Sequence, residues 1–150
     1  MRVITGKYKG RHFDVPRTFK ARPTTDFAKE NLFNVLRAYI DFPSTRALDL
    51  FAGTGSITLE LLSRGCPLVV SVEKDRQHFS FISAVLRKLD DPAARPYCGD
   101  ALRFVARCRS QFDLIFADPL RPARIARTAR PRYAEQCPRA RRYLRLRARR

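Results

Sequence analysis

Between residues 46 and 117, short apolar segments alternate with longer amphipathic ones, and this alternation constrains the fold more than any other feature of the sequence. The segment 68–72 (Leu-Val-Val-Ser-Val) is β-branched and apolar, as expected of a strand that is covered on both faces. Alternating strands and helices predict an α/β fold with a parallel sheet and helices on both of its faces. We expect strands at 46–51, 68–72, 95–98 and 112–117, and helices at 56–64, 75–89 and 101–108.

The part of the chain before this pattern predicts a hairpin followed by one helix. Residues 1–5 and 11–15 have the pattern of two short strands, joined by a basic, glycine-bounded turn. Thr25 or Asp26 can cap a helix that runs to about Tyr39. The apolar residues at helical spacing, which we expect to form its buried face, are Ala28, Leu32, Val35, Leu36 and Tyr39.

The composition changes abruptly after Pro119. Residues 120–150 contain twelve Arg, no Lys and one acid, and they carry +11 of the formal net charge of +17. Their only large aliphatic residues are Leu120, Ile125, Leu144 and Leu146, too few to complete a core. We therefore expect one folded unit over residues 1–119 and a disordered Arg-rich tail over 120–150.

The origin of this tail admits two interpretations. Arg, Pro and Ala dominate it, as in an out-of-frame translation of G+C-rich DNA, so we favour a frameshifted or truncated product. In that case the apolar fourth strand would be an exposed sheet edge. The alternative is a genuine basic arm that binds RNA phosphates.

The apolar stretches, the N-terminus, the histidines and the cysteines indicate where the protein is located and whether it binds a metal. No stretch approaches 18 apolar residues and the N-terminus does not resemble a secretory signal, so we expect a cytoplasmic protein without membrane contact. His12 and His78 stand alone, and no C-x-x-C pair is present, so no metal site is predicted. We expect reduced thiols at Cys66, Cys98, Cys108 and Cys137.

An acidic residue lies at or near the carboxyl end of each of the four predicted strands: Asp49, Glu73, Asp100 and Asp118. Ligands of such sheets bind beyond the carboxyl ends of the strands. Each acid alone could be a helix cap or a turn residue, but four together indicate a ligand site. The turn after the first strand, Phe-Ala-Gly-Thr-Gly at 51–55, contains two glycines that permit positive φ and let a ligand approach the backbone.

Two nucleotide-dependent chemistries fit this frame. A nicotinamide dehydrogenase would show Gly or Ala where this chain has Thr58, and it has no need of Asp-Pro after the fourth strand. S-adenosylmethionine needs an anionic partner for its ammonium group, where Asp49 stands, and a carboxylate such as Glu73 for the ribose diol. Asp100 could then accept from the adenine amino group, and Asp118 from the amine to be methylated. The methyltransferase interpretation fits better.

Residues 1–119 resemble the bacterial 16S ribosomal RNA guanine-N2 methyltransferases of the RsmD-like group. The most discriminating matches are the basic hairpin turn and the Arg-Pro-Thr-Thr segment at 22–25, because the glycine turn occurs in many methyltransferases. The matching segments are GKYKGR at 6–11, RPTTD at 22–26, DLFAGTG at 49–55, VEKD at 72–75 and FDLIFADP at 112–119.

This resemblance implies an incomplete Rossmann-like methyltransferase fold and transfer of a methyl group to the exocyclic N2 amine of a guanine in 16S rRNA. It implies a monomer acting on that rRNA or on a small-subunit assembly intermediate. Asp118 and Pro119 would face the target amine. The N-terminal hairpin would help to hold RNA through Lys7, Lys9 and Arg11, together with Arg22. The S-adenosylmethionine pocket would comprise Asp49, Phe51, Gly53, Gly55, Glu73, Lys74, Asp100 and Ala101.

The resemblance ends at Pro119. The family continues with Pro and then Tyr or Phe, an aromatic that stacks on the target base, whereas this chain has Leu120 and Arg121. We therefore expect impaired methyl transfer. The alternative function is that of a non-catalytic basic RNA-binding protein on a remnant nucleotide-binding fold. DNA amino-methylation shares the Asp-Pro step, but the Arg-Pro-Thr-Thr segment disfavours it.

Overall fold

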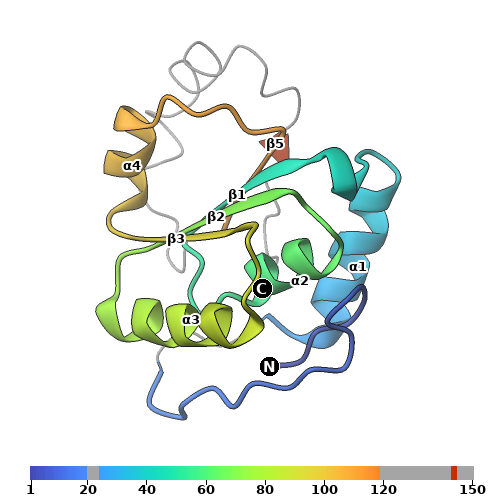
Figure 1. The fold of residues 1–150 in the computed structure, drawn as a ribbon, viewed down its shortest axis with the longest axis horizontal. Helices are drawn as coiled ribbons and strands as arrows, with labels where there is room; N and C mark the ends of the chain where they lie inside the picture. The colour runs from blue at the N-terminus through green and yellow to red at the C-terminus, as the bar shows by residue number, and fades with distance from the viewer. Residues whose placement is uncertain (20–23, 119–142, 145–150) are drawn as a thin grey trace.

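A computed structural model describes residues 1–19, 24–118 and 143–144, and its strands form one parallel sheet in the order β3-β2-β1-β4-β5 (Figure 1). The strands are β1 (Arg46–Leu50), β2 (Leu68–Glu73), β3 (Ala94–Cys98), β4 (Leu114–Ala117) and β5 (Tyr143–Leu144). The helices are α1 (Asp26–Arg37), the 3-10 turn η1 (Phe42–Ser44), α2 (Ser56–Ser63), α3 (Arg76–Leu89) and α4 (Ala101–Arg107). The predicted α/β fold with a parallel sheet is confirmed.

Helices cover both faces of the sheet, as the sequence predicts. In Figure 1, α4 lies over one face, while α2 and α3 lie over the other with α1 beside them. Each face has its own apolar cluster because successive strand residues point to opposite sides. In β1, Ala47 belongs to the larger cluster with α1, α2 and α3, whereas Leu48 and Leu50 belong to the cluster with α4.

Helix boundaries follow from local capping. The Thr25 hydroxyl accepts a hydrogen bond of 3.2 Å from the Ala28 amide at the start of α1. The Asp75 carboxylate accepts from two amides in the first turn of α3. Gly65, with φ +93°, follows the end of α2 and supplies the left-handed stop expected there.

The predicted buried face of α1 is only partly correct. Leu32 and Leu36 are buried, but Val35 and Tyr39 are 51% and 59% exposed, and Ala28 is exposed too. The buried face also includes Lys29 and Phe33. It is rotated because the N-terminal segment and α2 pack on the Lys29 side and supply polar partners for its ammonium group.

The N-terminal hairpin is shorter than predicted. Its backbone pairing is confined to residues 1–3 and 10–13, around the antiparallel bridge of Arg2 with His12, in place of two strands over 1–5 and 11–15. The reason is that, beyond Val3, backbone donors turn toward α2. The Lys7 amide donates to the Ser63 carbonyl at 2.8 Å, and the Ile4 amide donates to a Glu60 carboxylate oxygen at 2.6 Å. The hairpin thus satisfies a carbonyl that the end of α2 would leave without a partner.

Strand β5 pairs with β4, which was expected to be an exposed edge of the sheet. Tyr143 pairs with Ile115 and Leu144 with Phe116, so the prediction of an uncovered fourth strand is wrong at these two positions. Ile115 and Phe116 are also buried, at 7% and 9% exposed. The remainder of the predicted disordered tail, 119–142 and 145–150, lies outside the described residues, and its disorder stays a prediction.

Within the described part of the chain, every helix is too short or too polar to traverse a bilayer. The three described cysteines, Cys66, Cys98 and Cys108, are free thiols, and Cys137 lies outside that part.

Candidate functional site

The carboxyl ends of β1, β2 and β4 bring three acidic residues to one edge of the sheet. Leu50, the last residue of β1, is level with Val72 of β2 and Ala117 of β4. Glu73 and Asp118 each follow one residue later, and Asp49 lies one residue before Leu50. The negative charges of Glu73 and Asp118 both raise the pKa of Asp49, which agrees with the closeness that the strand register gives these residues.

Asp49 forms the floor of this edge. It is 2% exposed, and its Oδ2 accepts a hydrogen bond of 2.6 Å from the Thr58 hydroxyl of α2. Burial raises the pKa of Asp49 to about 7, against the opposing effect of the Thr58 hydrogen bonds. The nearby charges of Glu73 and Asp118 raise it further. Asp49 is therefore a carboxylate that a cation would stabilise.

The turn after β1 has the backbone that its glycines predict. Gly53 and Gly55 have φ of +58° and +79°, and Phe51 also has a positive φ, +64°, which ends β1 one residue earlier than expected. A Cβ at Gly55 would lie 2.5 Å from the Ile82 side chain of α3. The Cβ side of Gly55 is thus occupied by Ile82, and the predicted contact of Gly55 with a ligand stays a prediction.

Glu73 joins the turn to the start of α3. Its Oε2 accepts from the Gly53 amide and its Oε1 from the Asp75 amide, both at 2.7 Å. A carboxylate oxygen has two lone pairs, so each oxygen retains one for a further donor. Glu73 can therefore bind a diol without releasing the turn.

Asp100 serves first as a helix cap. Its Oδ1 accepts from the amides of Leu102 and Arg103 in α4, each at 3.1 Å, and its Oδ2 lies 3.3 Å from the Lys74 ammonium. The Arg103 amide is the largest cause that holds the pKa of Asp100 below its usual value, with Lys74 contributing too. Ala101, predicted in the pocket, is the buried first residue of α4.

Asp118 follows β4 at the same edge. The residue is exposed, but its surroundings desolvate the carboxyl enough to raise its pKa. Pro119 and Arg22, which the sequence places in the site, lie outside the described residues.

The hairpin residues predicted to hold RNA lie at the opposite edge of the sheet. The Lys7 ammonium is 2.9 Å from the carboxylate of Asp91, a residue that precedes β3. The Arg11 guanidinium lies 5.3 Å from the centre of the Tyr8 ring, and Lys9 is exposed. The structure thus does not bring Lys7, Lys9 and Arg11 together with Asp118.

The sequence interpretation missed a cavity of about 410 Å³ beside Asp100. Three of its lining side chains were not predicted as site residues: Tyr97 of β3, and Arg103 and Arg107 of α4. The available signal was the spacing of the two arginines, four residues apart on a predicted helix, which places them on one face.

The chain is similar to proteins from several bacteria. A family described as conserved hypothetical protein 95 matches residues 1–122, and the match ends close to the change in composition after residue 119. YlbH of Bacillus subtilis is 38% identical over 123 residues, which cover 79% of this chain and 66% of YlbH. Ribosomal RNA small subunit methyltransferase D of Escherichia coli is 35% identical over 119 residues, covering 79% of this chain and 59% of that protein. The chain thus spans less than two thirds of the length of these relatives.

The fold comparison agrees with the sequence comparison. The methyltransferase-like protein yhhF of Escherichia coli superposes with a TM-score of 0.70 at 32% identity, covering 80% of this chain and 64% of that one. The Thermus thermophilus protein TTHA0928 superposes with a TM-score of 0.68 at 30% identity, covering 79% and 69%.

Proposed function

The chain belongs to the conserved hypothetical protein 95 family, and on that premise we propose that it is an S-adenosylmethionine-dependent RNA methyltransferase. Its substrate would be the exocyclic N2 amine of a guanine in 16S rRNA, free or in a small-subunit assembly intermediate. The observation that carries the proposal is the meeting of Asp49, Glu73 and Asp118 at one sheet edge, beside a turn with two positive-φ glycines.

The residues at this edge fit the cofactor chemically. A buried carboxylate with a raised pKa, as at Asp49, is stabilised by a cationic partner, and the cofactor carries an ammonium and a sulfonium group. Glu73 retains one lone pair on each oxygen for the two ribose hydroxyls. Asp100 would accept from the adenine amino group through Oδ2, in competition with Lys74. When bound, S-adenosylmethionine supplies an electrophilic methyl group.

The chain's part in the reaction is to orient a weak nucleophile. The lone pair of the guanine N2 amine is delocalised into the ring, so accepting its two N–H bonds at fixed positions would turn the lone pair toward the methyl group. Asp118 and the carbonyl of Pro119 would accept these bonds. Positioning and electrostatics of this kind supply most of the rate gain, and the proton can leave after the methyl group has arrived. The guanine must be unpaired or flipped out of a helix to reach Asp118.

The second candidate is a basic RNA-binding protein without catalytic activity. The formal net charge of +17 favours RNA binding under either function. The family pattern has an aromatic residue where this chain has Arg121, and its absence favours impaired methyl transfer by this chain.

One set of experiments separates the two functions. S-adenosylmethionine binding is measured by calorimetry, and methyl transfer from labelled cofactor to 16S rRNA and to small subunits is measured beside it. We expect cofactor binding and weak N2-guanine methylation that Asp118→Ala abolishes without changing RNA affinity. A folded chain that binds RNA but neither binds the cofactor nor transfers methyl would establish the RNA-binding function. Transfer at the full rate of a longer relative would contradict the expected impairment.

A further inference from the structure

The cavity of about 410 Å³ lies beside the proposed cofactor site without being part of its floor. It is lined by Lys74, Tyr97, Gly99, Asp100, Arg103 and Arg107. Neither Asp49 nor Asp118 contributes to it. Lys74 and Asp100 form the common wall, since they follow β2 and β3 at the carboxyl edge and also face the cavity.

The cavity has an excess of positive charge. Asp100, the acid among the described lining residues, accepts from two amides of α4 and pairs with the Lys74 ammonium. Arg103 and Arg107 form no ion pair with any carboxylate in the described part of the chain. Being four residues apart on α4, they present their guanidinium groups on the same face. Guanidinium groups bind phosphate through paired hydrogen bonds, so this face favours a phosphate-bearing ligand.

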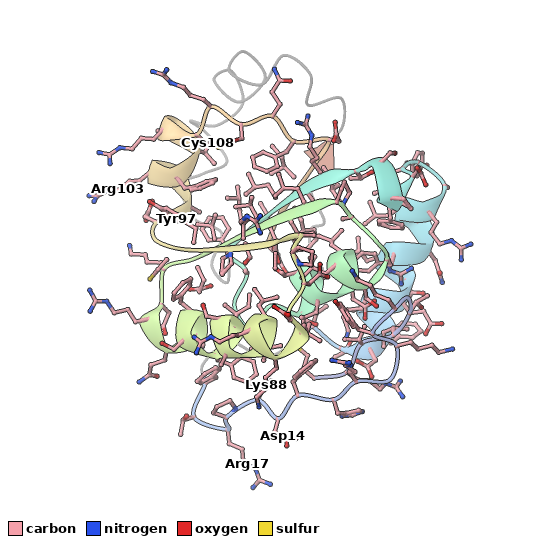
Figure 2. All side chains as sticks on the ribbon, viewed as in Figure 1. Asp14, Arg17, Lys88, Tyr97, Arg103 and Cys108 are labelled. Carbon is pink, nitrogen blue, oxygen red and sulfur yellow. The ribbon has the colours of Figure 1, made fainter. Side chains whose placement is uncertain are left out.

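An aromatic ring stands beside these cations. Tyr97 lies on β3, the edge strand of the sheet, and is 47% exposed. Its ring packs over Gly99, where a Cβ would lie 2.6 Å from the ring, and it contacts the Phe104 ring with centroids 4.9 Å apart. Figure 2 shows Tyr97 and Arg103 on the same side of the molecule, next to α4. Because these contacts already fix the ring of Tyr97 and leave it half exposed, a nucleic-acid base can stack on it at little cost in side-chain entropy.

We propose that this cavity binds one nucleotide of a single-stranded RNA segment, with its base stacked on Tyr97 and its phosphates bound by Arg103 and Arg107. The combination of cationic groups and an aromatic ring is how proteins bind single-stranded nucleic acid without base pairing. This inference rests on the proposed function, and it places an RNA contact at the same carboxyl end of the sheet as Asp118, three strands away in the order β3-β2-β1-β4, where the hairpin does not reach. Flanking RNA held here would keep an extruded guanine near Asp118.

A local readout is needed because the twelve arginines of residues 120–150 bind RNA on their own. The full chain is irradiated with a single-stranded RNA that carries 5-iodouridine, which crosslinks to stacked aromatic rings, and the crosslinked residue is mapped by mass spectrometry. We expect a crosslink at Tyr97. It should be retained on the peptide that contains residue 97 in Tyr97→Phe and lost in Tyr97→Leu. The double variant Arg103→Ala/Arg107→Ala should lower its yield by at least about fivefold.

Arg87→Ala is the matched control, since Arg87 is an exposed arginine in the last turn of α3, at the other edge of the sheet. It should leave the crosslink unchanged. Thermal unfolding verifies that each variant is folded. The inference is overturned if Tyr97 does not crosslink, or if the double variant keeps the wild-type yield.

Cofactor titration of the same variants separates this inference from the proposed function. Arg103→Ala/Arg107→Ala should bind S-adenosylmethionine as the wild type does. If that variant loses cofactor affinity and keeps the crosslink, the cavity belongs to the cofactor. If the wild-type chain does not bind S-adenosylmethionine at all, the proposed function fails whatever the crosslink shows.

Discussion

The hydroxyl of Thr58 donates a 2.6 Å hydrogen bond to Oδ2 of Asp49, and both residues are almost fully buried. Thr58 occupies the position at which a nicotinamide dehydrogenase turn would have Gly or Ala. The residue that distinguishes this chain from such dehydrogenases is therefore also the hydrogen-bond partner of Asp49, whose pKa is strongly raised. The hydrogen bond favours the charged form of Asp49, while burial disfavours it more strongly. The net result is a carboxyl poised to ionise near neutral pH.

This balance predicts a pH-dependent stability difference for Asp49→Asn. The pKa of Asp49 is raised from 3.8 to about 7, so the folded state keeps a proton that the unfolded state releases between these values. The contribution of Asp49 to the free energy of unfolding therefore falls as pH rises through this window. Above pH 7 the variant should be more stable than the wild type by about 2–4 kcal/mol, and at pH 4 the two should be equal. Urea unfolding at several pH values measures the difference, and a difference that does not change with pH would contradict the assignment.

Removal of the hydroxyl should weaken cofactor binding. Thr58→Val keeps the shape of the buried side chain but takes away a donor that favours ionised Asp49, so the pKa of Asp49 should rise further. At pH 7 we expect S-adenosylmethionine affinity to fall by about tenfold, a loss comparable with that of one charge-assisted hydrogen bond. Thr58→Ser retains the donor and should bind like the wild type. Equal affinities of Thr58→Val and Thr58→Ser in calorimetry would show that the hydroxyl has no such role.

Two glycines of the hairpin provide a matched pair for testing how it docks. Gly6 and Gly10 both have positive φ, +91° and +81°. A Cβ at Gly6 would lie 1.9 Å from the Ser63 carbonyl oxygen, whereas a Cβ at Gly10 would meet nothing within 4 Å. Gly10→Ala should cost about 1 kcal/mol in left-handed strain, and Gly6→Ala about 3 kcal/mol or more because the hairpin must also move off α2. Similar losses for the two variants in denaturant unfolding would mean that the hairpin does not dock as described.

The buried ammonium of Lys29 should be important for stability. Lys29 is 1% exposed and lies 3.5 Å from the carboxylate of Glu60, which is 0% exposed. Lys29→Met leaves that carboxylate short of a cation and should cost about 3–5 kcal/mol of unfolding free energy. Lys29→Met/Glu60→Gln should recover part of the loss, because it removes the buried carboxylate charge that Lys29 balances and keeps an acceptor for the Ile4 amide, while Arg64 loses its ion-pair partner. The exposed Lys88→Met is the control, with a change within about 0.5 kcal/mol. A small effect of Lys29→Met would argue against a buried pair.

The sheet could be predicted because its determinants are local. The β-branched segment at 68–72, the cap at Asp75 and the stop at Gly65 each specify a boundary within a few residues of sequence. The buried face of α1 could not be predicted, because its partners are distant. Lys29 is buried only because the N-terminal segment and Glu60 of α2 reach it, and helical periodicity does not register such contacts.

The positions of the acidic residues at the carboxyl ends of the strands could also be predicted, but their hydrogen-bond partners could not. Parallel strands end at the same edge, so Asp49, Glu73 and Asp118 had to lie near one another. Asp100 stands directly before the helix predicted from residue 101, at a cap position, and Asp49 lies within a predicted strand, but the sequence does not show that Thr58 would be the partner of Asp49. The cavity beside Tyr97 was missed because its side chains come from two elements whose packing the sequence does not specify.

The central claim is that the carboxyl edge of the sheet binds S-adenosylmethionine, and Glu73 tests it most directly. Calorimetric titration of the cofactor into the wild type, Glu73→Gln and the matched control Glu30→Gln, an exposed residue of α1, tests the ribose contact together with the one backbone acceptor that Gln lacks. We predict binding to one site in the wild type and in Glu30→Gln, and an affinity lower by at least about tenfold in Glu73→Gln, provided that its unfolding shows it to be folded. Equal affinity in all three proteins, or no heat of binding to the folded wild type, would contradict the claim.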